Sequence, residues 1–200
     1  MYLFFDTETT GFSAHKDRII QLAFILADEG GTIHEEFESL IQPEDWNMPS
    51  VELFMREGMT EAKAIERSQF WVDNGYTQED SELNGIYIYD ALRAFQEALK
   101  QCKYKVAHNI AFDNRFIEAS QLRESVSPEL FRFKKGFCTM KASTDYCAIP
   151  KARGYGYKWP KLQELHKKLY NEEFEDAHDA LADVKATKDC FFTLKNLGII

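Results

Sequence analysis

The stretch that decides the fold is YLFFDTETTG, residues 2–11. Its first half is aromatic and apolar and its end is polar, which predicts a buried strand over residues 2–9. Side chains alternate across a strand, so Asp6 and Glu8 are expected on one face. Two neighbouring carboxylates on a buried strand repel each other, and a hard cation would neutralise them. The alternative is that the strand ends here and both carboxylates lie in water. Gly11 permits close backbone approach or a positive φ beside the acids.

The segments that follow have the order of an α/β fold. A long apolar run over 18–28, a turn at Gly30–Gly31 and a polar-apolar run over 32–42 predict an antiparallel hairpin. Apolar spacing and capping residues then predict the remaining elements, which are helices over 87–101, 112–123, 161–169 and 179–196 and a strand over 104–107. Strands followed by helices that alternate with a strand predict an α/β sandwich with a mixed sheet.

Three segments are harder to interpret. Residues 59–65 are compatible with a short helix, and residues 137–149 fit either a strand or a helix. Residues 66–86 are polar and turn-rich with isolated aromatic residues, which predicts a long loop or a small insertion. The 200 residues are otherwise expected to form one domain, 1–200.

Composition excludes several classes of protein. With 44% hydrophobic and 14% aromatic residues, the chain is not disordered. The apolar run 22–27 is far shorter than the ~18 residues of a membrane span, so we expect no membrane association. The four cysteines form no metal-binding pattern, and free thiols in a reducing cytoplasm are the expected state.

Charge is spread unevenly along the chain. The formal net charge is −9, a poor indicator of nucleic-acid binding. Residues 132–168, however, hold ten basic and two acidic residues, a net charge of +8, so the rest of the chain carries −17. Such a division indicates either a basic surface that serves an anionic partner or a solvated basic face without a ligand.

Two further polar clusters accompany the first. HNIAFD, residues 108–113, lies where a predicted strand passes into a helix, a common ligand site in open α/β sheets. Alternatively, Asn109 caps that helix and Asp113 favours its positive N-terminus. In HDALAD, residues 178–183, an N-cap at Asp179 would place His178 in the preceding loop and Asp183 in the early turns.

Together and in this order, FDTETTG (5–11), HNIAFD (108–113) and HDALAD (178–183) resemble the three motifs of the DEDDh exonuclease superfamily. That superfamily includes the proofreading exonuclease (epsilon) subunit of bacterial DNA polymerase III. The sister DEDDy group would need Tyr at position 179, where this chain has Asp. The resemblance implies an RNase H-like fold, with a five-stranded mixed sheet flanked by helices.

The resemblance also implies a metal-dependent 3′–5′ exonuclease that releases nucleoside 5′-monophosphates from DNA. It implies two divalent ions, Mg²⁺ or Mn²⁺, and the carboxylates that would hold them are Asp6, Glu8, Asp113 and Asp183. His178 would be the general base, since a neutral imidazole accepts a proton at physiological pH. The residues expected to contact the 3′-terminal nucleotide are Thr9, Thr10, Gly11, Phe12, His108 and Asn109.

Partners follow from the same resemblance. Single-stranded 3′ ends are the expected ligand, with DNA favoured over RNA, and the aromatic and basic residues of 151–161 suit a single strand. A DNA polymerase or a second copy of the chain is an open partner that the sequence does not show. The alternatives are the same chemistry on RNA ends or a non-catalytic, polymerase-associated binding module.

Overall fold

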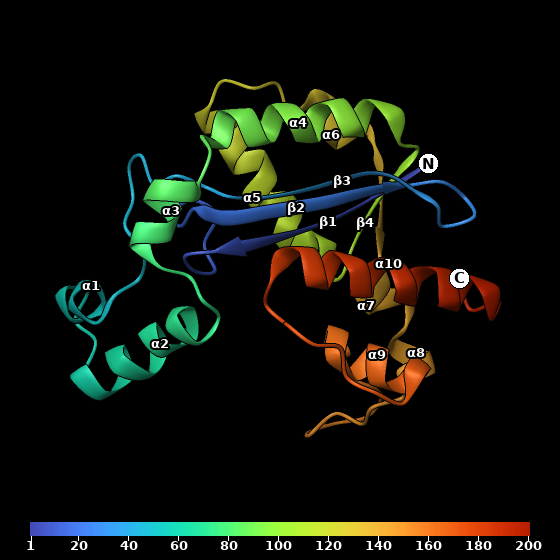
Figure 1. Ribbon diagram of the computed structural model, residues 1–200. Coiled ribbons are helices and arrows are strands. Elements are labelled where there is room, and N and C mark those ends of the chain that lie inside the picture. Colours follow the sequence, from blue (N-terminus) through green and yellow to red (C-terminus); the bar gives the residue numbers. More distant parts are fainter.

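The computed structural model describes all 200 residues and contains one five-stranded sheet with helices on both faces (Figure 1). The strands are β1 (Tyr2–Thr9), β2 (Ile19–Ala27), β3 (Ile33–Leu40), β4 (Tyr104–Ala107) and β5 (Lys135–Cys138), in the order β3-β2-β1-β4-β5. The first three strands form an antiparallel meander, whereas β4 and β5 run parallel to β1. The predicted mixed α/β sheet is therefore confirmed.

Ten helices complete the chain. They are α1 (Val51–Arg56), α2 (Glu61–Asp73), α3 (Gln78–Asn84), α4 (Ile88–Gln101), α5 (Ile110–Arg123), α6 (Glu129–Phe133), α7 (Thr139–Ala142), α8 (Thr144–Cys147), α9 (Leu162–Tyr170) and α10 (Ala180–Asn196). None is both long and apolar enough to cross a membrane. The ambiguous segment 137–149 becomes the end of β5 followed by two short helices.

Apolar side chains cover the two faces of the sheet differently. On one face, Leu3 and Phe5 of β1 pack with Phe95 of α4 and with α5 and α6. On the other face, Phe4 packs with Val184 and other residues of α10, so this helix lies directly over β1. Because Asp6 and Glu8 share the parity of Phe4 along β1, both lie on the α10 face.

The predicted loop over 66–86 is wrong. Most of this segment is helical, in α2 and α3, and the expected short helix over 59–65 is the start of α2. Trp71 is 6% exposed and belongs to a separate apolar cluster with Ile20, Met48 and Tyr76. The buried side of α2 also includes Ala64 and Ser68, whose small side chains leave little hydrophobic periodicity in the sequence.

Candidate active site

The carboxyl end of β1 carries the first acidic pair. The register of β1 against β2 shifts between Glu8 and Thr9, so the strand is irregular where it meets the site. Burial, and the negative charges of Asp113 and Asp183, raise the pKa of Asp6 well above its usual value. Burial and the same two charges raise the pKa of Glu8 to about 9. Both carboxylates therefore lie in a strongly negative environment.

Helix α5 brings Asp113 to this pair. Asp113 lies in the first turn of the helix and is 2% exposed. Its Oδ1 accepts hydrogen bonds from the Thr7 backbone N–H at 3.1 Å and from Thr7 Oγ1 at 2.9 Å. Burial raises the pKa of Asp113 to about 7, although the bonds from Thr7 oppose this rise. Thr7 thus holds one oxygen of this buried carboxylate through two hydrogen bonds.

The N-terminus of α10 supplies the third cluster, as the sequence predicted. Asp179 is the N-cap, and its side chain accepts a hydrogen bond from the Ala182 N–H at 2.9 Å. His178 precedes it with a left-handed backbone, φ 74°, and is exposed. Asp183 lies in the first turn, where burial raises its pKa to about 7. The start of α10 therefore carries two different groups. The imidazole in the preceding loop is exposed, and the carboxylate in the first turn is largely buried.

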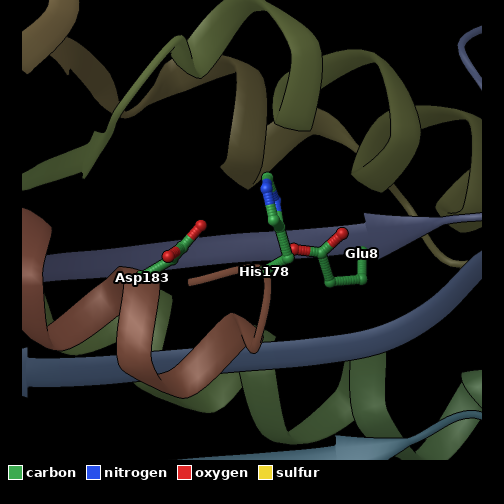
Figure 2. Close-up of side chains that lie close together, drawn as sticks. All are labelled: Glu8, His178 and Asp183. Carbon is green, nitrogen blue, oxygen red and sulfur yellow. The ribbon is translucent and has the colours of Figure 1, made fainter. Parts of the chain in front are cut away.

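Glu8, His178 and Asp183 form the closest group, with one ligand atom from each lying within 4.8 Å of the others. Figure 2 shows these side chains reaching one region from a strand, a loop and a helix. Asp6 and Asp113 are not in that group, but the charge of Asp113 helps to raise the pKa of Glu8, and the charges of Asp183 and Glu8 help to raise the pKa of Asp6.

The donor set fits a divalent cation. Asp183 Oδ1 is buried and has no hydrogen-bond partner. No lysine or arginine forms an ion pair with any of the four carboxylates. Several buried carboxylates without a basic partner are unfavourable when ionised, and hard oxygen-binding cations relieve that repulsion.

Two residues that the sequence analysis missed hold the His178 loop. The Tyr76 hydroxyl contacts Gln21 Oε1 and lies 2.8 Å from the His178 carbonyl oxygen, which accepts from it. Gln21 Oε1 also accepts from the Ala180 N–H at 2.9 Å, and Gln21 Nε2 donates to Asp179 Oδ2 at 3.0 Å. These contacts join residues that are between 55 and 159 positions apart, so no local pattern indicates them.

Helix α2 forms one wall of a cavity beside the carboxylates. The Phe70 ring lies 5.1 Å from the His178 ring, edge to face. The cavity measures about 420 Å³, and its lining includes Glu8, Phe12, Arg67 and Phe70. The segment predicted to be an insertion thus shapes the site.

The residues after the first acidic pair mostly stabilise their own loop. Thr9 Oγ1 donates to the Gly11 carbonyl at 2.7 Å, and Thr10 Oγ1 accepts from the Arg18 N–H at 3.0 Å. A Cβ at Gly11 would lie 2.5 Å from Asp17 Oδ2, so a larger residue there would have to displace that carboxylate. Phe12 is 77% exposed. Its ring centre lies 6.5 Å from that of Phe112. Because most of the ring faces solvent, it is available to contact a ligand.

The two residues at the end of β4 differ in their surroundings. The ring nitrogens of His108 lie 3.0 Å from Thr139 Oγ1 and 3.0 Å from the Pro160 carbonyl oxygen. Burial lowers the pKa of His108 to about 4, so the ring is neutral and joins two loops. Asn109 is the N-cap of α5 with φ 66°, yet its side chain makes no capping bond and is exposed. Only Asn109 keeps its side chain available to a ligand.

Comparisons with known proteins agree with this architecture. The family model described as Exonuclease (RNase T) matches residues 3–70 and 74–191. A DNA polymerase III of the PolC type from Staphylococcus aureus is 25% identical over 203 residues, a match that covers all of this chain but only 12% of the polymerase.

Solved structures show the same fold. Exonuclease I of E. coli, crystallised with a dA16 oligonucleotide, superposes with a TM-score of 0.74 at 20% identity, over 98% of this chain and 40% of that one. A zinc-bound form of its complex with single-stranded DNA gives a TM-score of 0.70 at 19% identity, with the same coverage. The chain therefore spans well under half the length of these relatives, and the five-stranded RNase H-like arrangement is the shared part.

Proposed function

Because the chain belongs to the exonuclease family, we propose that it removes nucleotides from the 3′ end of DNA with the help of two divalent metal ions. The products would be nucleoside 5′-monophosphates. The observation that carries the proposal is the close approach of Glu8, His178 and Asp183, with one oxygen of Asp183 buried and unpartnered.

The metal ligands in this proposal are Asp6, Glu8, Asp113 and Asp183. Two bound Mg²⁺ or Mn²⁺ ions would lower the pKa of a water and stabilise the charge that develops on the leaving 3′-oxygen. Thr7 keeps the Oδ1 atom of Asp113 occupied, so its other oxygen is the one free to bind. The raised pKa values of these acids mean that ion binding must displace protons at neutral pH.

His178 would accept the proton of the attacking water. Burial and the positive charge of Lys161 lower the pKa of His178, so its imidazole is neutral and able to accept a proton at pH 7. Its left-handed backbone and the Tyr76 hydroxyl hold it at the edge of the carboxylates. A single-stranded end could reach it because the side chain is exposed.

The cavity beside Glu8 would receive the terminal nucleoside. Phe12, in the loop after β1, and Phe70, in α2, both line it and offer apolar faces to a base. Thr9 and Gly11 also line it, and Thr10 would support their loop through its hydrogen bond from the Arg18 N–H. The oligonucleotide complexes of exonuclease I support DNA as the substrate, and the similarity to a PolC-type polymerase supports work beside a polymerase.

The test uses the same DNA labelled at the 5′ end or at the 3′ end, with Mg²⁺, Mn²⁺ or EDTA. A 3′–5′ enzyme releases the 3′ label as a mononucleotide at once and turns the 5′-labelled strand into a ladder. RNA of the same sequence runs in parallel. Faster cleavage of RNA would move the assignment to a ribonuclease.

The matched variants are Asp183→Asn in the site and Asp90→Asn on the exposed start of α4. Both remove one negative charge at nearly constant volume. We expect Asp183→Asn to lose at least about 100-fold in rate, as removal of a group that acts in the transition state does. Asp90→Asn should match the unaltered protein. Metal binding without cleavage of either DNA or RNA would refute the enzyme assignment in favour of a binding module.

A further inference from the structure

A hairpin turn, residues 149–158, closed by one antiparallel bridge between Pro150 and Tyr157, projects from the body of the protein between α8 and α9 (Figure 1). The Lys151 N–H donates to the Gly156 carbonyl at 3.2 Å, and the Lys158 N–H donates to the Ile149 carbonyl at 2.9 Å. Gly154 and Gly156 adopt positive φ at its tip, a conformation that most other residues would find strained. The segment is therefore a defined turn.

Aromatic side chains of this hairpin and of the residues that follow it face solvent. Tyr155 is fully exposed and Trp159 is 62% exposed. Lys141 Nζ lies 5.8 Å from the centre of the Trp159 ring. Large exposed rings beside cations are the arrangement that stacks bases and attracts phosphates in single-strand binding surfaces.

The basic side chains here are available to an anion. Lys151, Arg153 and Lys161 are exposed, and none forms an ion pair, whereas Lys158 pairs with Glu164. Residues 132–168 carry +8 while the rest of the chain carries −17. An approaching polyanion is therefore attracted to this span of the chain more than to the rest.

The base of the hairpin lies beside the active site. The Pro160 carbonyl accepts a hydrogen bond from the His108 ring at the end of β4, at 3.0 Å. Trp159 is thus adjacent in sequence to Pro160, which is hydrogen-bonded to the end of β4, next to β1 and its carboxylates.

We propose that the hairpin, with Trp159 and Lys161, binds the single-stranded DNA immediately upstream of the 3′ terminus that the active site holds. The inference rests on the proposed function, since it gives the substrate its path away from the site. The phosphates would follow Lys151 and Arg153, and a base would stack on Trp159 or Tyr155.

The test measures binding without cleavage, by fluorescence anisotropy in EDTA, with a 16-nucleotide DNA and a dinucleotide. The double variant Lys151→Ala/Arg153→Ala should weaken binding of the longer strand about tenfold. It should also lower the slope of log Kd against log salt by about 1.4, since each phosphate contact contributes about 0.7 for single strands. Trp159→Ala should weaken binding about tenfold through lost stacking. Binding of the dinucleotide, which is too short to extend beyond the active site, should not change.

The matched control is Arg93→Ala/Lys100→Ala, which removes the same charge from exposed positions of α4 on the opposite face of the sheet. Equal weakening by this control and the hairpin variant would overturn the proposal, because attraction would then be diffuse. So would unchanged binding in both hairpin variants. A 16-nucleotide RNA tests the same chemistry, and loss of its binding in the hairpin variants supports the surface equally.

Kinetics separate this proposal from the proposed function. In the hairpin variants, KM for the 16-nucleotide DNA should rise while kcat stays constant. If the unaltered protein cleaves nothing, the proposed function fails, and the anisotropy series still decides whether the hairpin binds single strands.

Discussion

Replacing Tyr76 by phenylalanine removes one oxygen atom that links the fold to the proposed general base. Tyr76 is 6% exposed, and its ring packs with Ile20, Met48 and Trp71, so the ring should stay in place. Only the hydroxyl contacts to Gln21 Oε1 and to the His178 carbonyl oxygen are lost. His178 would then keep its left-handed backbone, φ 74°, with less support.

The expected effect follows from the bonds removed. A neutral hydrogen bond contributes about 0.5–1.5 kcal/mol, and Gln21 Oε1 retains the Ala180 N–H. Water can reach the His178 carbonyl because the residue is exposed, so the loss should fall near 1 kcal/mol. A backbone in the left-handed region costs about 1–3 kcal/mol, so such a loss lets the loop relax in a sizeable fraction of molecules. We expect kcat to fall about fivefold, with KM and metal affinity unchanged.

The assay is steady-state cleavage of a 5′-labelled oligonucleotide with saturating Mn²⁺, together with the melting temperature. Tyr87→Phe is the matched control, because it removes the same atom from a side chain that is 52% exposed. A Tyr76→Phe protein with unchanged kcat would refute the argument that the hydroxyl positions His178. A rise in KM alone would refute it as well, since the loop would then act on substrate binding.

Three further predictions concern the carboxylates and their support. The pKa values of Asp113 and Asp183 are raised to about 7 in the folded protein. Near neutral pH the metal-free folded protein therefore holds protons that the unfolded chain has released. Its stability should fall as pH rises from 6.5 to 9, because these protons are lost. Thermal melts should show a loss of at least about 1 kcal/mol, roughly 2–4 °C, and Mn²⁺ should abolish the trend; a flat metal-free profile would contradict this. Thr7→Val removes the 2.9 Å bond to Asp113, so its pKa should rise and the pH–rate profile should move to higher pH, whereas an unmoved profile would show that the bond is dispensable. Gly11→Ala places a Cβ 2.5 Å from the Asp17 carboxylate, and chemical denaturation should report a loss of about 1 kcal/mol in the free energy of unfolding unless that carboxylate moves without loss.

Local patterns predicted much of the site. The period-two alternation of a strand placed Asp6 and Glu8 on one face, and the structure puts that face under α10. The capping preference of Asp179 placed His178 outside the helix and Asp183 inside it, as observed. These inferences held because each depends on the geometry of a single element.

Other features depend on contacts between distant segments. Tyr76 and Phe70 belong to a stretch whose polarity predicted a loop, yet its buried aromatic residues fold it as helices against the start of β2. His108 lies in a motif that predicted substrate contact, but Thr139 and Pro160 engage its ring nitrogens. Neither outcome follows from spacing along the chain.

The sequence by itself therefore determined the first four strands, the helices α4, α5, α9 and α10, and the family of the three acidic motifs, because hydrophobic period, caps and charges act over a few residues. Only the tertiary structure decided which carboxylates meet, what holds the His178 loop, and where the basic hairpin lies. Those outcomes depend on packing across the sheet, since burial there changes pKa values and creates hydrogen bonds between residues that are more than a hundred positions apart.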